Sequence, residues 1–211
     1  MAAPSPAIAD AHCYTSASDF CPLEHRMPEL RATPSRFGTG LELSIVIGMV
    51  LLAALSRLLP HPWNFSPLEA MALFAGARIG QRLLALLVPL AALLVSDLLL
   101  GFYADIWVVY GCFAAMALAG RGLRRAGPGR IAAYGLASAL GFFLITNFAV
   151  WAISDLYPNT AAGLAASYGA ALPFFKNQLA GVACYLVLLF GGHALLLRGL
   201  RPLNSADARA A

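Results

Sequence analysis

Charged residues are scarce in this sequence. Only 11% of its 211 residues are Asp, Glu, Lys or Arg, and Lys176 is the single lysine among them. A soluble domain carries about 25% charged residues, whereas this chain is 60% hydrophobic and has a mean hydropathy of +0.74. That composition excludes an ordinary soluble domain, because a soluble fold of this size cannot hide so much apolar surface.

The signature motifs of several enzyme classes are missing as well. The chain has no Gly-x-x-x-x-Gly-Lys-Ser/Thr loop for ATP, no Gly-x-Ser-x-Gly of a serine hydrolase and no His-Glu-x-x-His of a zinc protease. Its four cysteines form no Cys-x-x-Cys pair, and its arginines form no basic groove for nucleic acid. We therefore predict that the chain is not an enzyme, holds no metal or cofactor, and binds no nucleic acid.

Long apolar runs, in contrast, recur along the chain. A helix needs about 20 mostly apolar residues to cross the roughly 30 Å hydrocarbon core of a bilayer. The pattern predicts an all-α integral membrane protein, a bundle of about six transmembrane helices in contact with the lipid bilayer. The predicted helices cover residues 41–59, 66–79, 83–100, 106–119, 131–153 and 175–197.

Two of the predicted elements are unusual. Segment 161–171 is made mostly of small residues and is too short and too weakly apolar to span, so we expect an interfacial or re-entrant helix there. The short second helix begins with Ser66-Pro67-Leu68-Glu69, which is typical of a capping box. We expect Ser66 to be its N-cap, and Glu69 to bind a backbone amide rather than a ligand.

The two ends of the chain are polar. Residues 1–40 lack the apolar core of a secretory signal peptide and are predicted to be a disordered cytoplasmic lead. Met27 is an alternative translation start, in which case the residues before it have no function. The six-helix membrane domain is expected over residues 41–198, and a polar cytoplasmic tail over 199–211.

The distribution of arginine predicts the orientation in the membrane. Cytoplasmic loops keep the positive charge, and the arginines cluster in three segments that alternate correctly along the chain, at 78–82, 121–130 and 198–201. These segments are predicted to be cytoplasmic, so both termini are inside. Segments 57–66, 97–105 and 154–176 then face out.

Polar and aromatic residues gather on this predicted outer side, which favours a pocket open to the outside. An ionisable residue within a spanning segment costs about 2.5–3.5 kcal/mol to insert, so such residues normally face the bundle interior and pair or bind something. Asn147 and Trp151 are four residues apart and share a helix face, offering an amide beside a stacking surface. The substrate-binding candidates are Arg57, His61, Trp63, Asn64, Asp97, Asn147, Trp151, Lys176 and Asn177.

Structural roles for these residues stay open beside the binding role. A salt bridge between Arg57 and Asp97 has about the same weight as ligand binding, and tryptophan at a membrane edge is usually an anchor. His61 stands between two prolines and is more typical of a rigid loop than of a metal site.

Small residues at four-residue spacing allow helices to approach closely. Ala72, Gly76 and Gly80 are expected to form such a packing face. Ser44 and Gly48 in the first helix either pack in the same way or contact a partner protein.

Several motifs resemble those of a family of small bacterial membrane proteins grouped as DUF6580 and described as uncharacterised transport proteins. The motifs are Ser56-Arg57-Leu58-Leu59-Pro60-His61-Pro62-Trp63-Asn64-Phe65-Ser66-Pro67, Ala72-Leu73-Phe74-Ala75-Gly76-Ala77, Ser96-Asp97-Leu98-Leu99-Leu100-Gly101-Phe102, Phe143-Leu144-Ile145-Thr146-Asn147-Phe148-Ala149-Val150-Trp151 and Pro173-Phe174-Phe175-Lys176-Asn177. The resemblance covers about residues 45–197 and implies a location in the bacterial inner membrane.

The size and layout are in turn similar to the substrate-binding S components of energy-coupling factor (ECF) transporters. That similarity implies an outward-facing pocket for a vitamin or metal, and reorientation driven by a coupling subunit and ATPases. In those proteins small residues of the first helix contact the coupling subunit, and here Ser44 and Gly48 match that pattern without its usual alanines.

The leading functional hypothesis is a substrate-capture subunit for uptake of a small, polar and planar nutrient such as a vitamin or precursor. The alternative is a non-transport membrane scaffold or assembly factor that docks an envelope partner. A membrane enzyme using His61 and Asp97 is the weakest reading, since no nucleophile or metal set accompanies them.

Overall fold

The computed structural model describes residues 39–199 except His61 and Ala104. The predicted lead 1–40, the alternative start at Met27 and the tail 199–211 fall almost entirely outside the described residues, and so does the binding candidate His61.

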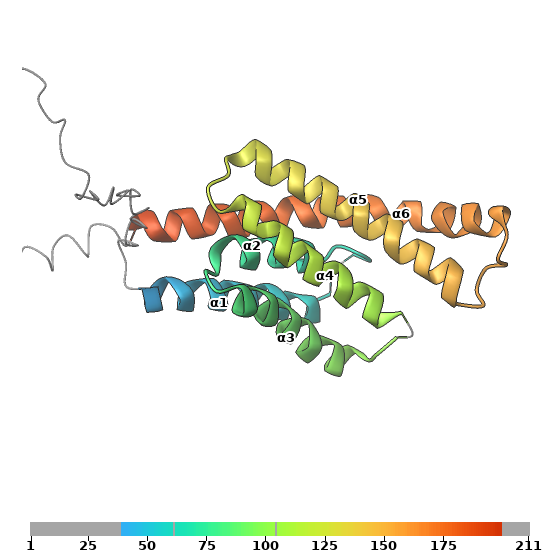
Figure 1. Ribbon diagram of the computed structural model, residues 1–211, viewed down its shortest axis with the longest axis horizontal. Helices are drawn as coiled ribbons and strands as arrows, with labels where there is room; N and C mark the ends of the chain where they lie inside the picture. The colour runs from blue at the N-terminus through green and yellow to red at the C-terminus, as the bar shows by residue number, and fades with distance from the viewer. Residues whose placement is uncertain (1–38, 61, 104, 200–211) are drawn as a thin grey trace, which may run out of the picture. The chain divides into compact units, whose positions relative to one another are not determined.

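The described chain is a bundle of helices, which confirms the all-α membrane fold (Figure 1). Its helices are α1 (Thr39–Leu55) with the short turn Ser56–Leu58, α2 (Leu68–Arg78), α3 (Arg82–Leu100), α4 (Ile106–Gly120) with the turn Arg121–Leu123, α5 (Pro128–Ile153) and α6 (Ala161–Leu186) with the π-helical turn Val187–Gly191. Five helical segments are long and apolar enough to cross a membrane. The chain is therefore a multi-pass membrane protein.

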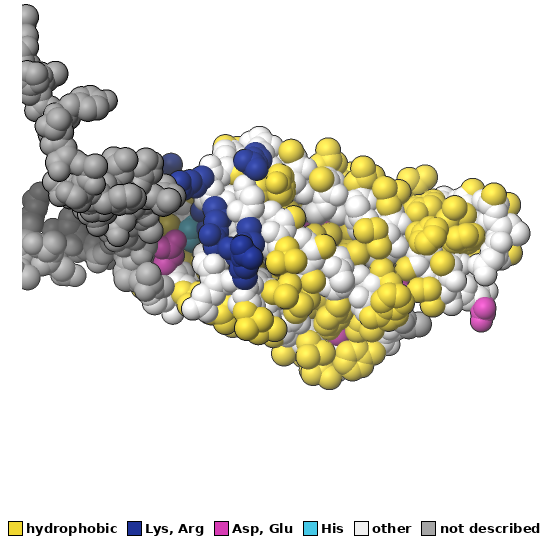
Figure 2. Space-filling model, in the orientation of Figure 1, with side chains coloured by type: hydrophobic (Ala, Val, Ile, Leu, Met, Phe, Trp, Pro, Cys, Tyr) yellow, Lys and Arg dark blue, Asp and Glu magenta, His cyan; other side chains and the backbone are white. Residues whose placement is uncertain are grey.

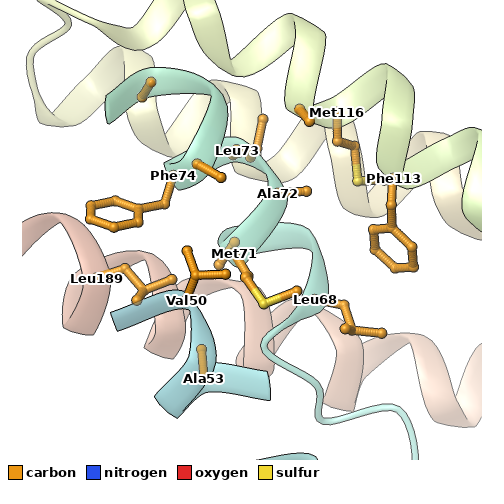
Figure 3. Close-up of a cluster of buried hydrophobic side chains, with 14 of the residues drawn as sticks. Val50, Ala53, Leu68, Met71, Ala72, Leu73, Phe74, Phe113, Met116 and Leu189 are labelled. Atoms are coloured by element: carbon orange, nitrogen blue, oxygen red, sulfur yellow. The ribbon is translucent and has the colours of Figure 1, made fainter. Parts of the chain in front are cut away.

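The short helix α2 lies at the centre of the bundle. Every residue from Leu68 to Ala77 is buried, and the side chains of α1, α4 and α6 surround it (Figure 3). Its 11 residues rise about 16 Å, roughly half of the 30 Å hydrocarbon core. A helix that is buried on all sides needs no polar face, which explains why α2 has no amphipathic pattern.

Two glycines bring α2 and α4 into backbone contact. A Cβ at Gly76 would lie 1.9 Å from the carbonyl oxygen of Ala117, and a Cβ at Gly120 would lie 2.3 Å from that of Leu73. Both distances are far inside van der Waals contact, so only glycine fits at either position. The expected packing role of Gly76 is confirmed.

Large side chains of α2 fill the space toward α1 and α6. The ring of Phe74 meets that of Phe190 edge-on, with centroids 5.2 Å apart, and it also contacts the ring of His193 at 5.5 Å. Met71 and Leu73 are 1% exposed. Figure 3 shows Val50 and Ala53 of α1 and Leu189 of the π-helical turn after α6 around this core.

Helix α6 corrects the prediction for the chain after residue 160. Segment 161–171 is not a separate interfacial or re-entrant helix, because one helical segment runs from Ala161 to Gly199 and passes through Pro173. Thr160 is its N-cap, with Oγ1 accepting a hydrogen bond from the Gly163 backbone N–H at 3.1 Å. The alanine-rich segment continues the helix because alanine has the highest helix propensity, even though its apolarity is weak.

The arginines gather at one end of the bundle, named here the arginine end (Figure 2). The helix α1 begins and α6 ends at this end (Figure 1), and the opposite end is named the far end. The residues of the arginine end are Arg78, Arg82, Arg121, Arg124, Arg125, Arg130 and Arg198. Which of the two ends is cytoplasmic stays a prediction.

The contact between α2 and α4 predicts an unequal response to two Gly-to-Ala changes. Gly76→Ala should lower the free energy of unfolding by about 1–3 kcal/mol, because the new methyl group forces two backbones apart. Gly111→Ala in α4 is the matched control, since nothing lies within 4 Å of its Cβ position. Thermal unfolding in detergent measures both variants, and equal stability of the two would contradict the packing.

Candidate functional site

An ion pair joins α1 to α3 near the far end. Arg57 Nη1 donates to Asp97 Oδ1 at 2.9 Å and also to the Ser96 hydroxyl. Tyr110 of α4 donates its hydroxyl to Asp97 Oδ2 at 3.1 Å. Asp97 is only 1% exposed, so its carboxylate depends on these partners. The salt bridge expected between Arg57 and Asp97 is confirmed, and their binding role stays a prediction.

A second polar contact lies between the end of α1 and α6. The hydroxyls of Ser56 and Tyr185 are 2.9 Å apart, and the ring of Tyr185 is 5.9 Å from that of Phe65. Gly181 lies against the backbone of Ser66, where a Cβ would come within 2.9 Å of the amide nitrogen. The segment that enters α2 is therefore packed directly on α6.

The third polar contact lies in the middle of the bundle. Gln178 Nε2 donates to Glu69 Oε1 at 2.5 Å and to the carbonyl oxygen of Ala139 at 3.0 Å. Ala139 is near the midpoint of α5, and Gln178 is near the midpoint of the helical segment Ala161–Gly199, so Glu69 is held about halfway along the bundle. Both Glu69 and Gln178 are 5% exposed.

This contact corrects the predicted capping box. The structure places Pro67 at the N-cap of α2 with no side-chain cap, and the Ser66 hydroxyl accepts only a long bond of 3.4 Å from the Leu68 amide. Glu69 turns into the bundle instead of back to the backbone, because the amide of Gln178 offers a partner in an otherwise apolar interior.

These three contacts involve α2 or helices that pack against it, and they are named here the polar cluster. Apart from Arg57 and Asp97, its members were missed as site candidates. Glu69, Tyr110 and Gln178 are polar residues within apolar helices and carry the signal that pointed to Asp97. The whole polar cluster is Ser56, Arg57, Glu69, Ser96, Asp97, Tyr110, Gln178 and Tyr185.

Other predicted site residues form a tether between α6 and the segment that enters α2. Asn177 Nδ2 donates to the carbonyl oxygen of Trp63 at 3.1 Å. Asn64 follows with a φ of 62°, the left-handed region that asparagine tolerates better than most residues. The side chain of Trp63 is 80% exposed. This segment thus presents a large ring at the surface while its backbone is bound to α6.

Asn147 and Trp151 lie on α5 as predicted, but their donors are used within the chain. Asn147 Nδ2 donates to the Phe143 carbonyl at 2.8 Å, and Trp151 Nε1 donates to the Pro158 carbonyl at 3.1 Å. The carbonyl of Asn147 also accepts a bond from Ser167 at 3.1 Å. The backbone carbonyl of Asn147 thus connects α5 to α6, and the Trp151 ring connects α5 to the loop that precedes α6; neither bonds to a member of the polar cluster.

The remaining candidates lie on the surface of the bundle. Lys176 is exposed and has no ion-pair partner among the described residues. Ser44 is exposed and donates to the Gly40 carbonyl at 3.0 Å, while nothing lies within 4 Å of a Cβ at Gly48. This face of α1 is therefore free of neighbours within the described chain, and its role as a partner contact stays a prediction.

The cavities do not coincide with the predicted pocket. One of about 690 Å³ lies between α5 and α6 toward the arginine end. Another of about 320 Å³ lies between α2, α4 and α5 and is lined by Leu73, Cys112 and Ile145 among others. None of the predicted substrate-binding residues that the structure describes lines either cavity.

Comparison with known protein families assigns the chain to one of them. Residues 39–203 match a family described as a family of unknown function (DUF6580), and the chain belongs to that family. No curated protein and no solved structure matches the chain. The family predicted from the motifs is thus confirmed, and its description assigns no activity.

The ion pair predicts that removing one of its two charges alone costs more stability than removing both. Asp97→Leu alone should lower the free energy of unfolding by about 3 kcal/mol, because it leaves the Arg57 guanidinium without its carboxylate. Adding Arg57→Met should restore most of that loss, since two apolar side chains leave no unpaired charge. Thermal unfolding of the two single variants and the double variant gives the coupling energy.

Asp105→Ala is the control for this cycle, because Asp105 precedes α4 without a side-chain capping bond. Additive losses in the double variant would show that Arg57 and Asp97 do not stabilise each other.

Proposed function

We propose that this chain is a membrane transport component that captures a small, polar, planar nutrient inside its helix bundle. The pair formed by Glu69 and Gln178 is the centre of the capture site in this proposal. One observation carries it: a carboxyl group with 5% exposure lies about halfway along a bundle of apolar helices, and its described side-chain partner is a single amide.

The free-energy cost of placing the Glu69 carboxyl group within the membrane favours a functional role for it. An ionisable residue within a membrane is expensive, so it normally faces the bundle interior and takes part in binding or in an ion pathway. Stability alone would be served better by an apolar pair of similar volume at Glu69 and Gln178. The pair lies at the packed centre of the bundle, where such a replacement would be simplest.

The chemistry of the pair suits a planar solute with a donor next to an acceptor. A carboxylate accepts hydrogen bonds, and an amide side chain both donates and accepts. A solute group such as an amide or a ring N–H beside C=O can replace the bond between Gln178 and Glu69 by one bond to each. The exchange leaves no buried polar group unpaired, so it avoids the desolvation cost of an unmade bond.

The far end offers the entry route. The described residues between Leu59 and Ser66 are not helical, and Trp63 and Asn64 among them are exposed, while the Trp63 carbonyl is bound by Asn177. Displacing this segment would open the start of α2, and with it Glu69, toward the far end. Non-helical backbone at membrane depth is tolerated where it is buried in protein or lines a cavity.

In this proposal the arginine end is cytoplasmic and the far end faces out, as the distribution of arginine predicts. The chain would act like the substrate-binding component of an ECF transporter, binding its solute from outside before a partner drives reorientation. The open face of α1 at Ser44 and Gly48 supports a partner contact, because the described chain leaves it uncovered.

The scaffold alternative is favoured by the exposed rings near the far end. Trp63 is 80% exposed and Trp107 is 63% exposed. Large exposed aromatic side chains are typical of docking surfaces as well as of membrane interfaces.

Solute capture predicts a binding defect without a folding defect. The full-length protein purified from membranes should retain a metabolite that mass spectrometry detects after denaturation. Glu69→Gln should weaken rebinding of that metabolite at least tenfold, because it replaces one of the two carboxyl oxygens by an NH2 group. Glu42→Gln in α1 is the matched control. The proposal fails if no metabolite is retained, or if Glu69→Gln alters only the unfolding temperature.

The partner prediction is tested by affinity purification of the full chain from its native membrane. A coupling subunit with ATPases should co-purify, and Gly48→Trp should release them while leaving the bundle folded. Recovery of an envelope protein alone, displaced by Trp63→Ala rather than by Gly48→Trp, would support the scaffold instead.

A further inference from the structure

An apolar groove runs along the surface between α5 and α6. Its volume is about 690 Å³, and apart from Arg78 its lining consists of apolar residues and glycine. On α6 the lining extends from Leu179 to Ala194, a rise of about 22 Å along the helix. That length exceeds the thickness of one leaflet of the hydrocarbon core, about 15 Å.

The groove opens toward the surroundings of the bundle. Leu136 of α5 is 59% exposed and Val187 of α6 is 72% exposed, and both line it. The floor is closed where a Cβ at Gly135 would lie 2.3 Å from the Leu186 side chain. In a membrane protein such an exposed apolar channel faces lipid rather than water.

Arg78 is the one charged side chain among the described residues that line the groove. Its guanidinium carbon lies 5.4 Å from the centre of the Phe190 ring, and its Nη1 donates a long bond of 3.4 Å to the Arg124 carbonyl. Its Nε is buried and has no hydrogen-bond partner among the described residues. A buried donor without a partner costs about 1–3 kcal/mol, so this guanidinium can still bind an acceptor.

The charge around Arg78 is not balanced by the described chain. Seven arginines among the described residues lie at the arginine end, and the described salt bridge, between Arg57 and Asp97, lies toward the other end. Glu42 of α1 is the acidic residue that the described chain places near the arginine end. An anion therefore meets a strongly positive surface here.

The wall of the groove also contains an irregular turn. Val187–Gly191 is a π-helical turn, and Val187, Phe190 and Gly191 of this turn line the groove. Single π-helical turns within α-helices occur frequently at functional sites. Phe190 of this turn contacts the guanidinium of Arg78 with its ring.

We infer that this groove binds an anionic phospholipid of the surrounding bilayer, with one acyl chain between α5 and α6 and the phosphate against Arg78. The acyl chain matches the apolar walls and their length, and the phosphate supplies the acceptor that the guanidinium lacks. A net negative headgroup is favoured over a zwitterionic one, because a quaternary ammonium would have to lie among the arginines. The inference does not depend on the proposed function, since Glu69 and Gln178 are absent from the groove lining.

The test uses the full-length protein in a neutral detergent, with thermal unfolding followed during lipid addition. Phosphatidylglycerol should raise the unfolding temperature, whereas phosphatidylcholine with the same acyl chains should raise it far less. Arg78→Gln should weaken the apparent affinity for phosphatidylglycerol about tenfold, as expected for one charge-assisted hydrogen bond. Arg125→Gln removes a charge from the same end outside the groove and should keep the wild-type response.

A second pair of variants tests the acyl site and remains informative if Arg78→Gln fails to fold. Ala132→Trp fills the groove from an exposed position, and Ala133→Trp places the same ring on the neighbouring exposed residue outside it. Only Ala132→Trp should abolish stabilisation by phosphatidylglycerol. Equal stabilisation by phosphatidylcholine, equal loss in both tryptophan variants, or stabilisation by glycerol phosphate alone would each overturn the inference.

Discussion

The close contact between the backbones of α2 and α4 is the constraint on which the rest of the structure depends. At Gly76 and Gly120 each helix lies against a carbonyl of the other, leaving no space for a side chain. Apolar side chains gain little from leaving lipid tails, so helices in a membrane associate through close packing and polar contacts. This contact fixes α2 at the centre, where it is buried on all sides. The other helices then pack around a helix that is only half as long as the bilayer is thick.

A half-length central helix forces the chain to cross the remaining distance without helical hydrogen bonds. In hydrocarbon each unsatisfied backbone group is costly, and the segment before α2 meets this demand by lying against α6. Gly181 allows the approach to Ser66, and Asn177 binds the Trp63 carbonyl. The polar cluster therefore exists where it does because this is the place in the bundle at which the backbone is irregular. Because the backbone is irregular there, a solute can enter at the polar cluster without breaking helical hydrogen bonds.

The sequence alone predicted the features that depend on local composition, such as the positions of the helices. It did not predict the features that depend on contacts between residues far apart in the chain. Apolar length predicted most helices to within a few residues, and charges within apolar helices indicated the pairing of Arg57 with Asp97 as one of two roles. Glu69 was misassigned because its local pattern fits a capping box, while its actual partner, Gln178, is 109 residues away. Pro173 did not end a helix, since the alanine-rich residues before it keep helical geometry. The groove between α5 and α6 has no local signature at all.

The two ends of α2 carry side chains of opposite charge, and each charge is the one that the helix dipole favours at that end. Glu69 lies in the first turn and Arg78 in the last, where a carboxylate and a guanidinium are each favoured. Arg124 strengthens this arrangement by donating to the carbonyls of Gly80 at 2.8 Å and Ile79 at 3.3 Å. The solute proposed at Glu69 and the phosphate inferred at Arg78 would thus bind opposite ends of one rigid, buried helix. Since Gly76 places the backbone of that helix against the backbone of α4, any movement that opens one end must carry α4 with it or break this backbone contact.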